Sequence, residues 1–254
     1  GQNVYLYCAS QGLATVVRGL IDKKELAEHL IEKAGVAVVP GTAFGLAGHF
    51  VIEQTGRNSA GYFMNFNGTA GIWRKKTIED AGGWQADTLT EDLDLSYRAQ
   101  LAGWKLKFVS DVVCPAEIPV TINAFKSQQH RWAKGSIQVA KKMLPLICKS
   151  DVSFKIKMEA FFHLTNNVAY VFLLVLAALQ LPNMLIRRHM EDPRLLLLDV
   201  PLFWATCGSV AAFYVVAHRD LYGSTWGAVK RLPAMMALGI GLAVNNGRAA
   251  VEGW

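Results

Sequence analysis

Charged residues and cysteines are scarce in this chain of 254 residues, which has 18% charged residues and four cysteines. The cysteines are far apart and form no CxxC pair, so neither a zinc site nor a disulfide framework is predicted. No basic stretch followed by an apolar run stands at the N-terminus, and we therefore expect no signal peptide. A hydrophobic content of 52% excludes a disordered chain, a collagen or coiled-coil repeat, and a disulfide-stapled secreted module.

The few charges are unevenly distributed. Residues 161–254 hold only 12 of the 46 charged side chains, whereas residues 126–157 hold eight basic side chains and one acidic one. A net charge of +6 is compatible with a nucleic-acid partner, but the basic block lies directly before the first long apolar run. Clustered lysine and arginine beside a span set its orientation and attract anionic lipid. The pattern therefore favours a lipid bilayer over nucleic acid, with the block on the cytoplasmic face of the cell (inner) membrane.

Three apolar stretches are candidate membrane spans. Residues 160–186 carry no formal charge, and 27 residues in a helix reach roughly 40 Å, more than the ~30 Å hydrocarbon core of a bilayer. Residues 195–218 are interrupted only by Asp199 and Pro201 near one end. Residues 232–247 are short and predict either a tilted span or a re-entrant segment. The alternative, buried helices of a large soluble protein, would need more covering protein than the chain provides.

The middle of the chain carries a glycine-broken run and a helix start. Residues 61–74 (GYFMNFNGTAGIWR) predict strand structure, interrupted where a bulge forms or a ligand approaches the backbone. A helix is predicted to begin near Thr90 and to end at Gly103. Thr90, Glu91 and Asp92 have a purely structural explanation, an N-cap followed by acids in a positive first turn.

A second polar motif, QQHRW, lies inside the basic block. Gln128 and Arg131 are three residues apart and share a helix face, and Trp132 is four residues from Gln128. An arginine fork with an amide beside it can hold a diphosphate, and an indole ring offers a flat surface for a sugar. The alternative is an amphipathic interfacial helix whose tryptophan and lysines anchor it at the lipid headgroups.

The order FNGTAG, TED and QxxRW, followed by apolar spans, resembles the processive membrane glycosyltransferases of family 2, the cellulose-synthase- and mannan-synthase-like group. The similarity extends from about His49 (HFVIEQTGRN) to AVNNGRAAVEG, near the end of the sequence. It implies a GT-A-like catalytic domain on the cytoplasmic face. It also implies an inverting hexosyltransferase reaction, in which a sugar moves from a nucleotide sugar to a glycan acceptor, as in β-glycan synthesis.

The resemblance also implies roles for individual residues. Asp92 is expected to act as the general base, and Gln128 and Arg131 to hold the diphosphate. Trp132 is expected to stack on the acceptor sugar. The residues expected to line the acceptor end are Thr90, Glu91, Gly68 and Thr69.

The family binds Mg or Mn through a DxD motif that precedes the region equivalent to His49. The only D-x-D in this chain is Asp92-Leu93-Asp94, which belongs to the TED helix. We therefore expect the metal ligands and the base-recognition half to be absent from this chain, and its binding of sugar nucleotides to be weak.

Residues 1–46, with the run GVAVVPGTAFG, resemble the C-terminal small domain of fold-type I pyridoxal-phosphate aminotransferases. Residues 22–34 predict a helix and residues 36–39 a strand. No catalytic role carries over, and an unrelated αβ segment is the alternative. This resemblance suggests a fused reading frame.

The predicted fold class is α/β plus transmembrane α. The predicted divisions are residues 1–47 (aminotransferase-like), 48–125 (C-terminal half of a GT-A-like domain), 126–158 (amphipathic interfacial helices) and 159–254 (two or three spans). A catalytically inactive mosaic membrane protein and an aminotransferase fragment are the alternative functions. The oligomeric state is not predicted.

Overall fold

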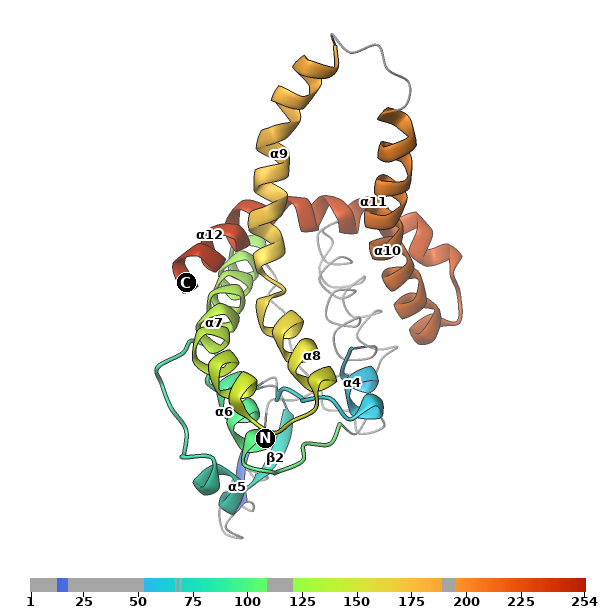
Figure 1. The fold of residues 1–254 in the computed structure, drawn as a ribbon. Coiled ribbons are helices and arrows are strands. Elements are labelled where there is room, and N and C mark those ends of the chain that lie inside the picture. Colours follow the sequence, from blue (N-terminus) through green and yellow to red (C-terminus); the bar gives the residue numbers. More distant parts are fainter. Residues whose placement is uncertain (1–12, 18–52, 67, 69, 109–120, 189–194) are drawn as a thin grey trace.

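The computed structural model describes residues 13–17, 53–66, 68, 70–108, 121–188 and 195–254. This part of the chain is mostly helical (Figure 1). The helix expected at 22–34 and the strand expected at 36–39 lie outside these ranges. The predicted origin of residues 1–47 therefore stays a prediction.

Strands make a smaller contribution than expected. Within the described ranges they are β1 (Leu13–Val17) and β2 (Ala70–Arg74), an antiparallel pair with Thr15 opposite Ile72. The strand predicted over residues 61–74 is thus confirmed only at its end. Residues 62–66 instead lie along helix α6 (Glu91–Leu101), whose side chains bind their backbone groups. Gln100 bonds both the N–H and the carbonyl of Met64, each at 2.7 Å, and Ser96 Oγ accepts from the N–H of Phe66 at 2.8 Å.

Short helices α4 (Gln54–Ala60) and α5 (Lys75–Asp80) flank β2 in the sequence, and α6 follows them. The predicted start of α6 near Thr90 is confirmed, because Thr90 stands at the N-cap position. Its hydroxyl makes no capping bond, and the Asp92 carboxylate accepts from the Leu93 N–H at 2.8 Å instead. Gly103, at φ +88°, follows the end of the helix as expected.

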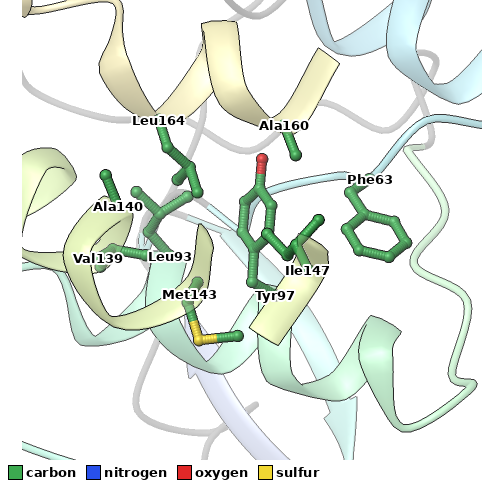
Figure 2. Packing of buried hydrophobic residues seen from close by; sticks show 9 residues of the cluster. All are labelled: Phe63, Leu93, Tyr97, Val139, Ala140, Met143, Ile147, Ala160 and Leu164. Carbon is green, nitrogen blue, oxygen red and sulfur yellow. The ribbon is translucent and has the colours of Figure 1, made fainter. Parts of the chain in front are cut away.

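The main core forms where α6, α7 (Ile122–Lys149) and α8 (Phe154–Thr165) meet (Figure 2). The ring of Tyr97 stands at its centre, fully buried, and its hydroxyl lies 2.7 Å from His163 Nδ1. The buried members of the cluster are Phe63, Leu93, Tyr97, Val139, Ala140, Met143, Ile147, Ala160 and Leu164. The apolar face of α7 is therefore covered by protein, whereas the sequence also allowed a helix whose apolar face lies among lipid headgroups.

Among the described residues, two helices are long and apolar enough to cross a membrane, α9 (Val168–Arg187) and α10 (Leu195–Tyr222). None of the side chains of α9 is buried in the protein, as a lipid-facing helix requires. Of the charge-free stretch predicted at 160–186, residues 168–186 belong to the candidate span α9, and the stretch before them does not. Residues 160–165 belong to α8, and the chain turns at Asn166 and Asn167 before α9 begins.

The last two helices are α11 (Trp226–Gly241) and α12 (Ala243–Gly253), bent by 41° at Leu242. Together they satisfy the length and composition of a third, broken span or of a re-entrant segment, the two alternatives expected for residues 232–247. In Figure 1 they run across the direction of α9 and α10, and α12 packs against α7 and α9.

Candidate active site where α6 meets α7

Asp92 lies in the first turn of α6, with its carboxylate facing the backbone of Gly68. A Cβ atom built on Gly68 would lie 2.9 Å from Asp92 Oδ2, and Gly68 has φ +65°, which favours glycine. The structure thus brings together two of the predicted site residues, Asp92 and Gly68. Thr69, which was predicted beside them, lies outside the described residues.

Burial, with a smaller contribution from the charge of Glu91, raises the pKa of Asp92 to about 6. The N–H of Leu93 and the positive charge of Arg131 act in the opposite direction. This carboxyl is therefore ionised at neutral pH but is a stronger base than an ordinary aspartate. The influence of Arg131 also shows that the QxxRW motif lies within electrostatic reach of Asp92.

Thr90 joins the two helices directly. Its side chain lies against Gly135 of α7, where an added Cβ would lie 2.6 Å from Thr90 Cγ2 and 2.7 Å from Thr90 Oγ1. The buried hydroxyl of Thr90 makes no hydrogen bond to the described residues. Glu91 is exposed beside it. An open hollow of about 300 Å³ starts at Glu91 and continues along Trp84, Gln85, Ala86, Thr88 and Leu89.

The QxxRW residues lie in the N-terminal half of α7. Arg131 is exposed, and Trp132 and Gln128 are half-buried. The side-chain oxygen of Gln128 is buried and makes no hydrogen bond to the described residues. The charge of Arg131 acts on Asp92, while the roles of Asp92, Arg131, Gln128 and Trp132 stay predictions.

Helix α12 holds the same part of α7. His130 Nδ1 lies 3.2 Å from the carbonyl oxygen of Asn245, and His130 Nε2 lies 3.1 Å from Glu252 Oε2. Glu252 also pairs with Lys134 at 3.3 Å. Gly253 lets the helices approach closely, since a Cβ there would lie 2.7 Å from the backbone oxygen of Lys134. AVNNGRAAVEG was predicted only as a family-like segment, and this contact was not predicted.

Two further residues of α7 contact the TED segment and were not among the predicted site residues. Gln138 Oε1 accepts from the N–H of Leu89 at 2.9 Å, and Lys142 Nζ lies 2.9 Å from Asp94 Oδ1. The signal that could have found them is the helical repeat. Glycine or polar residues at spacings of three, four, three and four place Gln128, Arg131, Gly135, Gln138 and Lys142 on one face of α7.

The pair Asp92 and Asp94 does not fit a metal site. Asp94 is fully buried, and its two oxygens are paired with Arg98 at 2.8 Å and with Lys142 at 2.9 Å. Two cations already neutralise this buried carboxylate, and their positive charge would oppose a metal ion at the same place. Across the part of the chain that the structure describes, no three His, Cys, Asp or Glu side chains are grouped closely enough to hold one.

Comparison with known proteins places the chain in a family. Residues 42–217 match the family described as Glycosyl transferase family group 2. The chain belongs to glycosyltransferase family 2, and it is related to plant glucomannan mannosyltransferases. The predicted resemblance to the cellulose- and mannan-synthase-like group is thereby confirmed.

Three of the relatives illustrate the extent of the similarity. "Probable glucomannan 4-beta-mannosyltransferase 11" of Oryza sativa subsp. japonica is 37% identical, over 66% of this chain and 31% of its own length. "Probable glucomannan 4-beta-mannosyltransferase 14" of Arabidopsis thaliana is 32% identical, over 75% and 37%. "Glucomannan 4-beta-mannosyltransferase 1" of Cyamopsis tetragonoloba is 44% identical, over 48% and 24%. The chain thus spans about a third of the relatives' length. No solved structure gives a significant match.

Proposed function

We propose that this chain carries the acceptor and leaving-group side of a mannosyltransferase site at a membrane surface. It would transfer a mannosyl residue, with inversion, from a nucleoside-diphosphate sugar to the end of a β-glycan. The observation that supports this proposal most strongly is the approach of the TED segment to α7, with Thr90 against Gly135 and Asp92 within reach of the charge of Arg131. The names of the relatives supply the sugar.

In the proposed reaction Asp92 takes the proton of the acceptor hydroxyl. The acceptor oxygen forms a bond to the anomeric carbon from one side, while the bond from that carbon to the diphosphate oxygen breaks on the other side. A pKa of about 6 suits this step, because the carboxylate is ionised at neutral pH and still accepts a proton readily. Gly68 leaves space free beside the Asp92 carboxylate, and a larger residue at this position would occupy that space.

The leaving diphosphate carries the negative charge that develops during transfer. Arg131 is exposed on α7 and can offer its guanidinium fork to the phosphate oxygens, with the Gln128 amide one turn away. Trp132 would stack on the acceptor sugar, and Thr90, Glu91 and Thr69 would complete the acceptor end. The hollow lined by residues from Trp84 to Glu91 is large enough for a sugar ring, and Glu91 precedes Asp92 in the chain.

The membrane would keep this site close to the growing glycan. Helix α8 leads through the turn at Asn166 and Asn167 into α9, so the core beneath α6 is tied to the first span. We propose that the site faces the cytoplasm, because the basic residues of α7 and α8 precede α9. Nucleotide sugars are made on that side, and the product would be delivered at the membrane.

The proposal is tested with membranes from cells that express the full chain, and each donor is supplied at saturating concentration because weak binding of sugar nucleotides is expected. GDP-mannose, GDP-glucose and UDP-glucose, each radiolabelled, are supplied in turn, and label in insoluble polymer is counted before and after digestion with a β-1,4-mannanase. We expect label from the mannose donor, sensitive to the mannanase and lost in Asp92→Asn. Glu79→Gln, at an exposed position on α5, is the control and should behave as the parent. No incorporation, or equal incorporation in Asp92→Asn, would overturn the proposal.

A further inference from the structure

One face of α7 continues from the QxxRW motif to the loop that precedes α6. Gln128 and Arg131 belong to the motif, and Gly135, Gln138 and Lys142 follow at successive turns on the same side of the helix. The last three all contact the segment between residues 85 and 94. The arginine proposed to hold the diphosphate and the contacts to the TED segment thus lie on one rigid element.

The first contact is the close approach at Gly135. A Cβ there would lie within 3.0 Å of the Thr90 backbone nitrogen as well as of the Thr90 side chain. A backbone atom cannot move aside as a flexible side chain does, so α7 can lie this close to Thr90 only with glycine at position 135. The second contact is the bond from the Leu89 N–H to Gln138. It engages a backbone group that precedes the first turn of α6.

Lys142 makes the third and most extensive contact. Its ammonium group lies 2.9 Å from Asp94 Oδ1, 2.9 Å from Asp87 Oδ2 and 2.6 Å from Gln85 Oε1. The hydrogen bond from Lys142 lowers the pKa of Asp87. Asp94 is fully buried, so loss of one of its cations leaves a poorly compensated buried charge. Lys142 therefore fixes both the loop and the first turn of α6.

These contacts control where Asp92 stands relative to Arg131. Asp92 and Asp94 share the first turn of α6, and the clearance between Gly68 and Asp92 Oδ2 is already small. A displacement of that turn away from α7 would therefore move the carboxylate. A displacement of about 1 Å in a reacting group can cost roughly a hundredfold in rate.

We propose that Gln138 and Lys142 are positioning residues that hold the Thr90–Glu91–Asp92 segment in register with Arg131. The inference rests on the function proposed above, because it takes Asp92 and Arg131 as the reacting pair. Neither residue touches the reacting atoms. Their effect is exerted on the base through Leu89 and Asp94.

The test uses two measurements on the full chain. Amide hydrogen exchange of the segment 84–92 in detergent reports the position of the loop without any catalysis. We expect exchange to be about tenfold faster in Lys142→Met than in the parent, even though Lys142 makes no bond to the Leu89 N–H. The control is Lys149→Met, at the exposed end of the same helix, which should exchange at the parent rate. Unchanged exchange in Lys142→Met would overturn the proposal.

The second measurement separates kcat from KM in sugar transfer. Lys142→Met and Gln138→Ala should each lower kcat about tenfold or more while the KM for the donor stays within about twofold, and Lys142→Arg should recover most of kcat. A kcat equal to that of the parent in Lys142→Met, when Asp92→Asn is inactive, would overturn the positioning role. If the parent itself transfers no sugar, the proposed function fails and the exchange measurement decides whether the contacts hold the loop.

Discussion

Replacement of Asp92 by asparagine should stabilise the protein at neutral pH while it removes the base. Burial raises the pKa of Asp92 from an ordinary value of 3.8 to about 6 in the folded chain. At one pKa unit per 1.36 kcal/mol, keeping this carboxylate ionised costs the folded state about 3 kcal/mol. Asparagine keeps an oxygen that can accept from the Leu93 N–H but carries no charge.

The sign follows from the two pKa values. Well below pH 3.8 the carboxyl is neutral in both the folded and the unfolded chain. The free energies of unfolding of the parent and of Asp92→Asn therefore differ by a constant amount there. Between pH 4 and pH 6 the unfolded chain ionises first, and the parent loses stability relative to Asp92→Asn. Above about pH 6 the difference in stability between Asp92→Asn and the parent stays constant. For a chain of this size it corresponds to roughly 6 to 12 °C in thermal midpoint.

The assay is thermal unfolding in detergent from pH 4 to pH 8, with Asp87→Asn as control. Asp87 is exposed and its pKa is lowered, so the control should be no more stable than the parent at any pH. Sugar transfer by the parent should fall about tenfold per pH unit below pH 6, because the protonated base is inactive. A stability gap between parent and Asp92→Asn that does not change with pH would refute the reasoning.

Three further predictions concern the surroundings of the base. Gly68→Ala should lower transfer at least tenfold because its Cβ would lie 2.9 Å from the base, whereas Gly61→Ala, at a similar positive φ with open space around it, should cost only stability, about 1 kcal/mol. Gly253→Leu should lower the free energy of unfolding by about 1–3 kcal/mol, and with it the thermal midpoint, since α12 must move off α7, and Val251→Leu at an exposed position should not. Trp84→Ala should raise the acceptor KM about three- to tenfold and leave the donor KM unchanged; equal rises in both would argue against an acceptor role for the hollow.

Local signals in the sequence predicted the helical parts of the site well. The start of α6 at Thr90 and its end before Gly103 follow from short-range chemistry, and the structure shows both. The two apolar spans were likewise found from composition. Features of this kind depend on neighbouring residues alone, so they can be read without knowing the fold.

Long-range contacts explain where the sequence misled. Residues 62–66 look like a strand, but Ser96 and Gln100 of α6 bind their backbone and hold them outside a sheet. Residues 160–165 look like part of a span, but Ala160 and Leu164 are buried in the core around Tyr97. An apolar segment does not reveal whether lipid or protein will cover it.

The basic residues of 126–157 show that net charge is just as limited as a guide to what a side chain contacts. The lysines among them were assigned together to the membrane surface, yet Lys142 is only 24% exposed in its side chain and pairs with the fully buried Asp94. Net charge in a window cannot identify a partner that is distant in sequence. The helical repeat from Gln128 to Lys142 carries that information, because it shows which side chains share the face of α7 that meets α6.

The central claim is that Asp92 and Arg131 act at one site, as base and as diphosphate holder. It is tested most directly by measuring nucleoside-diphosphate affinity and sugar transfer together in the parent, Asp92→Asn and Arg131→Ala. The account predicts that Asp92→Asn keeps the affinity within about twofold and loses transfer by a factor on the order of a thousand, while Arg131→Ala loses both. Parent-like transfer in Asp92→Asn, or parent-like affinity in Arg131→Ala, would contradict it.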